Sequence, residues 1–322
     1  TLVLFIAFLG RGAILTWFNP APNQINRSDR GGGGRRDPPE VSGETDDQAG
    51  IGEQAVQDSE TTTLSNLAPQ LSKLKNINGP GTDAHPWLSP DGLTIYWDRG
   101  AAIWAASRSS AGADFEKPRL LIPGRHPTLS GDQLDLIVLA MDDDERPLGL
   151  ATRSSAESSF GPVRVIEELR NQSHVKSPAL SDDGLTLVFE QGIPPKEKRF
   201  VISRRNDRNA RWSTPQLLPV DAGPYGDEPW TWAFLSPDRL TLFCCYGGVK
   251  LNRFLVGRRA TAGKTFADFQ LVQVGNPAAE GRAPRYVKAT NELFFSTVPS
   301  PESRDSEGEL WVIKNFHPPA RR

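Results

Sequence analysis

The chain has 322 residues, with 37 lysines and arginines against 39 aspartates and glutamates, and a net charge of −2. A balance this close to zero argues against bulk electrostatic binding to nucleic acid or to an anionic membrane surface. The 29 glycines and 27 prolines favour a turn-rich fold over a helical bundle, and the adjacent Cys244 and Cys245 exclude a disulfide-framework domain.

Residues 1–19 form the most apolar stretch of the sequence. The run from Leu2 to Phe18 is interrupted only by Arg11 and is close to the lower length limit of a membrane-spanning helix. The chain starts at Thr1, so we expect a fragment or processed form in which preceding residues bring Arg11 nearer one end of the segment. We therefore interpret 1–19 as an anchor or signal segment, with a buried core strand as the alternative.

Residues 20–62 have the composition of a flexible linker. Four consecutive glycines at 31–34 are followed by Arg35 and Arg36, and then by eight acidic residues between Asp37 and Glu60. Large apolar side chains are nearly absent, so this segment cannot bury enough surface to offset the entropy lost on ordering. The sequence predicts a disordered tether here, and a short tail at 317–322.

The rest of the chain, residues 63–316, contains an internal repeat. Each of the first four copies places a short apolar run before a Ser-x-Asp turn and an alternating strand after it, as in Leu-Ser-Pro-Asp-Gly-Leu-Thr at 88–94, whereas a fifth copy has lost the turn. The positions aligned across the five copies are Ser89, Ser130, Ser181, Ser236 and Lys288. Their separations of 41, 51, 55 and 52 residues are the size of one propeller blade.

Two further strands follow in each copy, the last one beginning near an aromatic residue and a proline. Four strands per repeat predict an all-β fold, a five-bladed β-propeller of four-stranded antiparallel blades. The fifth copy has no fourth strand of its own after residue 315. The segment Asn66–Leu71 resembles the missing strand, and we expect it to pair as the outer strand of blade five and close the ring.

These motifs resemble the WD40-like, or PD40, β-propeller repeat family, which includes the TolB propeller. The resemblance rests on the heptapeptides at 88–94, 180–186 and 235–241 and on Ile-Trp-Ala-Ala-Ser-Arg at 103–108. The family shares no catalytic residues, so the resemblance implies no catalytic residue and no cofactor. It implies a bacterial envelope protein, membrane-anchored or periplasmic, with the propeller outside the cytoplasm.

Polar and aromatic residues precede the first strand of each repeat, where the loops of a propeller surround the mouth of its central channel. They are Asp83, His85, Arg125, His126, His174, Lys176, Asp227, Glu228, Trp230, Trp232, Arg282 and Arg285. We expect the cations among them, with His126 charged, to converge on one opening.

Such a mouth would bind an anionic or saccharide ligand, since Arg and His hold carboxylates or phosphates and Trp stacks on sugars. A merely solvated polar mouth is the alternative interpretation. Three histidines with Asp83 or Glu228 contain enough ligands for a metal ion. No local metal-binding motif accompanies them, however, and we assign no metal and no cofactor.

The sequence thus favours a non-enzymatic binding, scaffold or sensor module. Its partner would be an unknown protein or an anionic or saccharide ligand, without nucleic acid, and residues 1–19 would provide a membrane tether. Two alternatives stay open. One is a propeller lyase or glycoside hydrolase acting on acidic sugars at the channel mouth. The other is an extracytoplasmic domain of a larger enzyme, such as a serine/threonine kinase, whose catalytic part lies upstream.

Overall fold

The computed structural model describes residues 68–319, except 142–146, 173, 194–196, 227–229, 247–252, 274–279 and 299–307. The chain divides into two units, Thr1–Thr61 and Thr62–Arg322. The predicted anchor and tether, 1–19 and 20–62, lie outside the described residues. No segment of the described part forms a helix long and apolar enough to cross a membrane.

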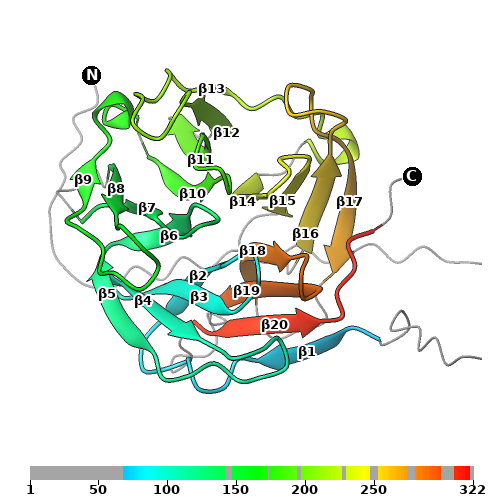
Figure 1. Ribbon diagram of the computed structural model, residues 1–322. Helices are drawn as coiled ribbons and strands as arrows, with labels where there is room; N and C mark the ends of the chain where they lie inside the picture. Colours follow the sequence, from blue (N-terminus) through cyan, green and yellow to red (C-terminus); the bar gives the residue numbers. More distant parts are fainter. Residues whose placement is uncertain are drawn as a thin grey trace, which may run out of the picture. The chain divides into compact units, whose positions relative to one another are not determined.

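The second unit is a propeller of five four-stranded antiparallel sheets, as predicted (Figure 1). Blade 1 contains β2 (Asp83–Leu88), β3 (Thr94–Arg99), β4 (Ala102–Ser107) and β5 (Arg119–Pro123). Blade 2 contains β6 (Arg125–Leu129), β7 (Asp135–Leu139), β8 (Leu148–Thr152) and β9 (Arg164–Val165). Blade 3 contains β10 (Lys176–Leu180), β11 (Thr186–Ile193), β12 (Glu197–Arg204) and β13 (Gln216–Leu217).

Blade 4 contains β14 (Trp230–Leu235), β15 (Thr241–Tyr246), β16 (Arg253–Arg258) and β17 (Ala267–Gln273). Blade 5 is built from β18 (Glu280–Val287), β19 (Glu292–Val298), β20 (Leu310–Lys314) and β1 (Gln70–Lys73). Two short 3-10 helices, η2 (Glu167–Leu169) and η3 (Gly223–Tyr225), lie between strands of successive blades. The strands named first in each blade surround the central axis (Figure 1).

The ring is closed by the N-terminal strand. β1 pairs antiparallel with β20 in the register Gln70 to Lys314 through Lys73 to Trp311. This pairing confirms the predicted closure, although the strand starts at Gln70 rather than at Asn66. Pairing removes an edge that would otherwise expose unpaired main-chain groups on blade 5.

The Ser-x-Asp turn explains why four of the repeats are so alike. In blade 1 the Ser89 hydroxyl donates to Asp91 Oδ1 at 2.5 Å, and Oδ1 also accepts from Leu93 N at 2.9 Å. Ser89 Oγ in turn accepts from Thr94 N, and the same set of bonds recurs in blades 2, 3 and 4. The fifth copy lacks this turn. There the strand register places Val287, rather than Lys288, at the aligned position.

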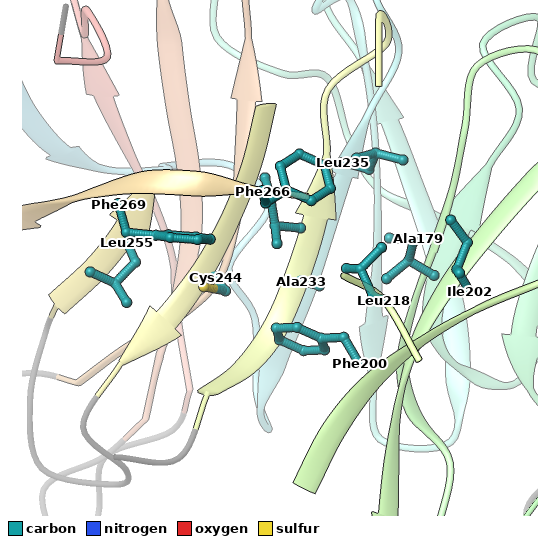
Figure 2. Packing of buried hydrophobic residues seen from close by; sticks show 12 residues of the cluster. Ala179, Phe200, Ile202, Leu218, Ala233, Leu235, Cys244, Leu255, Phe266 and Phe269 are labelled. Carbon is teal, nitrogen blue, oxygen red and sulfur yellow. The ribbon is translucent and has the colours of Figure 1, made fainter. Parts of the chain in front are cut away.

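The hydrophobic core lies between neighbouring blades, and we call each such contact a seam. In the seam of blades 3 and 4, residues of β10 and β12 face residues of β14, β15 and β16 (Figure 2). Cys244 packs into this seam and Cys245 into the next one, so the two thiols occupy opposite faces of β15. Burial raises the pKa of both thiols, which agrees with the prediction that they are packing residues.

Candidate functional site

Each innermost strand carries a β-bulge at the same place. The register shifts lie between residues 84 and 87, 125 and 128, 176 and 179, 231 and 234, and 282 and 285. The first bulge residue has a φ of 50–52° in every blade; these residues are His85, His126, Ser177, Trp232 and Ala283. A positive φ at a non-glycine residue is strained, so its recurrence five times means that the surrounding sheet imposes it.

Most of the bulges have proline as their second residue. Proline has no main-chain N–H to donate, and the innermost strand is the sheet edge that faces the channel, so no ladder hydrogen bond is lost. The second residues are Pro86, Pro127, Pro178, Ala233 and Pro284. Three consecutive residues at the bulge of each blade, fifteen in all, line one cavity of about 50 Å³.

Two histidines are stacked in this cavity. The rings of His85 and His126 are 3.6 Å apart between centroids. His85 Nδ1 lies 2.8 Å from Asp98 Oδ1, and its Nε2 accepts from the indole N–H of Trp232 at 3.2 Å. His126 Nδ1 accepts from the main-chain N–H of Ser177 at 3.2 Å. The expected charge of His126 stays a prediction.

Trp232, on β14 of blade 4, contacts residues of blades 1 and 5. Its ring contacts His85 on one side, and the guanidinium carbon of Arg282 lies 4.9 Å from its centroid. The Trp232 ring is partly exposed. Trp87, which follows His85 by two residues on β2, is only 3% exposed. The cavity therefore has an aromatic rim that is fixed by a hydrogen bond and a cation–π contact.

Three buried donors that belong to the lining of the cavity have no hydrogen-bond partner among the described residues. They are Trp87 Nε1, Ser177 Oγ and Arg285 Nε. A buried polar group without a partner costs about 1–3 kcal/mol, so such groups normally mark the place of water or of a ligand.

Arg285 is the only charged residue in the described lining of this cavity. Its guanidinium carbon lies 4.8 Å from the centroid of Trp87 and 4.2 Å from that of Phe234, and its Nη2 donates to Leu88 O at 3.0 Å. Burial lowers the pKa of Arg285 to about 10. The charge of Asp182 acts against this shift, and burial raises the pKa of Asp182 although Arg285 opposes the rise. The two do not come within ion-pair distance.

The structure brings together four of the twelve predicted site residues in the cavity lining: His85, His126, Trp232 and Arg285. Arg282 joins them through its contact with Trp232. All five lie on innermost strands and not on the loops before them. The exposed Lys176 and the half-buried Arg125 do not belong to this lining, so the expected convergence of cations on one opening stays a prediction.

Other predicted site residues have structural roles. Asp83 is fully buried and its Oδ1 accepts from Trp97 Nε1 at 2.6 Å and from Arg99 Nε at 2.7 Å. Trp230 donates to Tyr225 O and packs against Phe269 in the seam core, away from the channel. These contacts position strands rather than offer free groups.

The remaining predicted residues are either exposed or not described. His174 lies in the turn before β10 and is exposed. Asp227 and Glu228 lie outside the described residues. Within the described ranges no group of three His, Cys, Asp or Glu side chains is placed to hold a metal ion.

Asp98, Ser177 and Trp87 are site residues that the sequence reading missed. A signal exists for the bulge positions: a residue followed by proline recurs on the innermost strand of four blades, as His-Pro at 85–86 and 126–127, Ser-Pro at 177–178 and Ala-Pro at 283–284. The recurrence was hidden in blade 5 by the one-residue error in the alignment of its turn. Asp98 has no such signal, because its role depends on the contact between two strands.

No protein-family model matches the chain, and no curated protein matches it either. Among solved structures, a thermostable family-43 glycoside hydrolase is similar, with a TM-score of 0.51 and 11% identity over 76% of this chain and 91% of that chain. TolB of Agrobacterium tumefaciens has a TM-score of 0.47 and 11% identity over 77% of this chain and 86% of that chain. TolB of Acinetobacter baumannii has a TM-score of 0.46 and 12% identity over 73% of this chain and 54% of that chain. At these identities the likeness concerns the propeller fold alone.

Proposed function

We propose that the propeller is a non-enzymatic binding module that receives a small anionic group of its ligand, a carboxylate or a phosphate, in the channel cavity. The observation that supports this most directly is the set of three unpartnered donors among the described lining residues, one of which is Arg285 Nε. Hydrogen-bond donors and one buried cation attract an anion, and the described residues of the lining include no carboxylate to compete with it.

The size of the cavity determines which part of a ligand enters. Sites for whole small molecules usually enclose about 300–1,000 Å³, whereas this cavity encloses about 50 Å³. It has room for an anionic tip or for a few water molecules. The body of the ligand would then lie outside, against the rim of Trp232 and Arg282. A protein side chain or chain terminus fits this description.

The enzymatic alternatives receive less support from this geometry. A glycoside hydrolase acts through two carboxyl groups that flank the bond to be cleaved, and the described residues of the cavity lining offer none. The likeness to a family-43 glycoside hydrolase concerns the fold. We keep the WD40-like family, the bacterial envelope location and the membrane tether as parts of the proposal that rest on the sequence.

Acetate and acetamide, which differ in charge but hardly in size, test the proposal. We expect acetate to raise the melting temperature of the full chain and acetamide to leave it unchanged, with ionic strength held constant by sodium chloride. Ser177→Ala and Trp87→Phe each remove one donor and should weaken acetate binding about tenfold or more, as measured by calorimetry.

Thr128→Val is the matched control for these variants. It removes a hydroxyl group from the same cavity, but this oxygen already accepts from Leu180 N at 2.9 Å. We expect it to lower stability and to retain acetate binding. An equal response to acetate and acetamide, or acetate binding unaffected by Ser177→Ala and Trp87→Phe, would leave the cavity as a water site and overturn the proposal.

A further inference from the structure

Four arginines make a repeated contact across the seams between blades. They follow the third strands of blades 1 to 4 and are Arg108, Arg153, Arg205 and Arg259. In each case Nε donates at 2.8 Å to a main-chain oxygen in the first turn of its own blade. Each guanidinium carbon also lies 4.2–4.8 Å from the centroid of an aromatic ring. This shared orientation turns the other guanidinium nitrogens toward the preceding blade.

In three seams the preceding blade provides an acceptor for the arginine. The acceptors are the Glu292 carboxylate for Arg108, the Tyr96 hydroxyl for Arg153 at 2.9 Å, and the Asp135 carboxylate for Arg205 at 2.5 Å. Glu292 and Asp135 occupy the same register position, the first residue of the second strand of their blades. Each of these buried arginines is therefore neutralised or hydrogen-bonded by its neighbour.

The seam of blades 3 and 4 lacks such an acceptor. Arg259 is 4% exposed, yet no carboxylate lies within ion-pair distance of it among the described residues. The position held by Asp135 and Glu292 in the sister seams is Thr186 here. A buried guanidinium without a counter-charge is costly.

A second arginine enters the same place. Arg239 lies in the turn of blade 4, at the position that Gly184 occupies in the turn of blade 3, and it has a φ of 60°. A Cβ atom at Gly184 would lie 3.5 Å from both Arg205 Nη2 and Asp135 Oδ2. A side chain at this turn position thus points into the seam contact. In blade 4, Arg239 Nη1 accordingly lies 3.5 Å from Thr186 Oγ1 and 3.2 Å from the half-exposed Asp183.

A third arginine completes the cluster. Arg204 is the cross-strand partner of Thr186 in blade 3. Burial, together with the charges of Arg204 and Arg239, lowers the pKa of Arg259 to about 10. The described carboxylate that contacts this cluster, Asp183, pairs with Arg239 and not with Arg259.

We propose that this seam is an anion-binding site, in which an oxyanion or a carboxylate from outside the chain takes the place that Asp135 and Glu292 fill in the sister seams. Guanidinium groups bind both kinds of group through paired N–H donors. The anion is either a free ion such as phosphate or the acidic side chain of a partner protein. This site is separate from the channel cavity and does not depend on the function proposed for it.

The test supplies the missing carboxylate from within the chain. Inorganic phosphate should raise the melting temperature of the full chain more than sodium chloride of equal ionic strength does. Thr186→Asp should raise the melting temperature without phosphate, by about 2–4 °C for each kcal/mol gained. It should also weaken phosphate binding about tenfold or more, measured by calorimetry.

Thr241→Asp is the matched control, because Thr241 is the equivalent residue of blade 4 and also has a cross-strand arginine, Arg258. The facing residue in blade 5 is Phe316, which makes the main-chain bond that the arginines make elsewhere. This variant should gain no stability and should keep the phosphate response. Arg239→Gly places glycine at this turn position, as in blade 3, and removes one cation, so it should weaken phosphate binding. This second variant tests the proposal even if Thr186→Asp does not fold.

An acidic peptide and its glutamine counterpart distinguish the two sources of the anion. Binding of phosphate identifies a free-ion site, whereas binding of the acidic peptide alone identifies a carboxylate from a partner protein. The Ser177→Ala variant of the channel should leave either response unchanged. If neither probe binds, or if Thr186→Asp and Thr241→Asp behave alike, the proposal is overturned.

Discussion

Removal of residues 1–75 is expected to lower the melting temperature of the propeller sharply. This truncation deletes β1, whose four residues pair with β20, and with it Leu71 and Leu74, which pack against two different core clusters. Truncating one buried leucine costs about 2–5 kcal/mol, and the deletion also leaves β20 as an unpaired edge. We expect a total loss of about 5 kcal/mol or more, and aggregation through the new edge.

The control is removal of residues 1–61 only, which constitute the other unit of the chain. This shorter truncation should melt at the temperature of the full chain in differential scanning calorimetry. A truncation at residue 75 that melts as the full chain does would show that the closing strand contributes nothing to stability, and would contradict the closure.

The blades could be predicted because four of the repeats build the same tight turn with the same residue types. The hydroxyl and carboxylate of Ser89 and Asp91 satisfy the main-chain groups of a tight turn, and their spacing recurs without change in three further blades. Ring closure could be predicted for a related reason. A blade with three strands in sequence needs a fourth, and the only unassigned segment with strand character lay before the first repeat.

The site was predicted less well, because side-chain direction at the channel is set by the bulges. A period-two strand would have placed His85 and Trp87 on the same face, but the bulge at 84–87 alters the alternation and buries Trp87 beneath the rim. The contacts of His85 could not be predicted either, because its partners Asp98 and Trp232 lie in another strand and in another blade.

Sequence also could not show that the seams differ from one another. The arginine at the end of the third strand recurs, but its acceptor lies roughly seventy residues away for Arg205 and 184 residues away for Arg108. Only the assembled ring reveals that Glu292 and Asp135 form ion pairs with two of these arginines, Arg108 and Arg205. Thr186, at the equivalent position of blade 3, offers no carboxylate to Arg259. The repeats therefore serve as internal references for one another.

The seam of blades 5 and 1 gives the second large effect, because it joins the two ends of the ring through a buried ion pair. The side chains of Arg108 and Glu292 are 2% and 3% exposed, and Arg108 Nη1 donates to Glu292 Oε1 at 3.2 Å beside a second, shorter bond. Glu292→Ala leaves a buried guanidinium without its counter-charge. We expect it to lower the free energy of unfolding by about 3–5 kcal/mol, measured by urea denaturation at pH 7.

The double variant Arg108→Met, Glu292→Met separates charge from packing. Removing both partners in favour of apolar side chains of similar volume eliminates the buried charge, so the loss should be far smaller than for Glu292→Ala alone, with a strongly non-additive double-mutant cycle. The methionine at 108 can retain a contact with Phe115, whose ring the guanidinium now covers at 4.8 Å. If Glu292→Ala changes stability by less than about 0.5 kcal/mol, as an ordinary surface substitution does, then Arg108 finds another counter-charge and the seams are not held by these arginines.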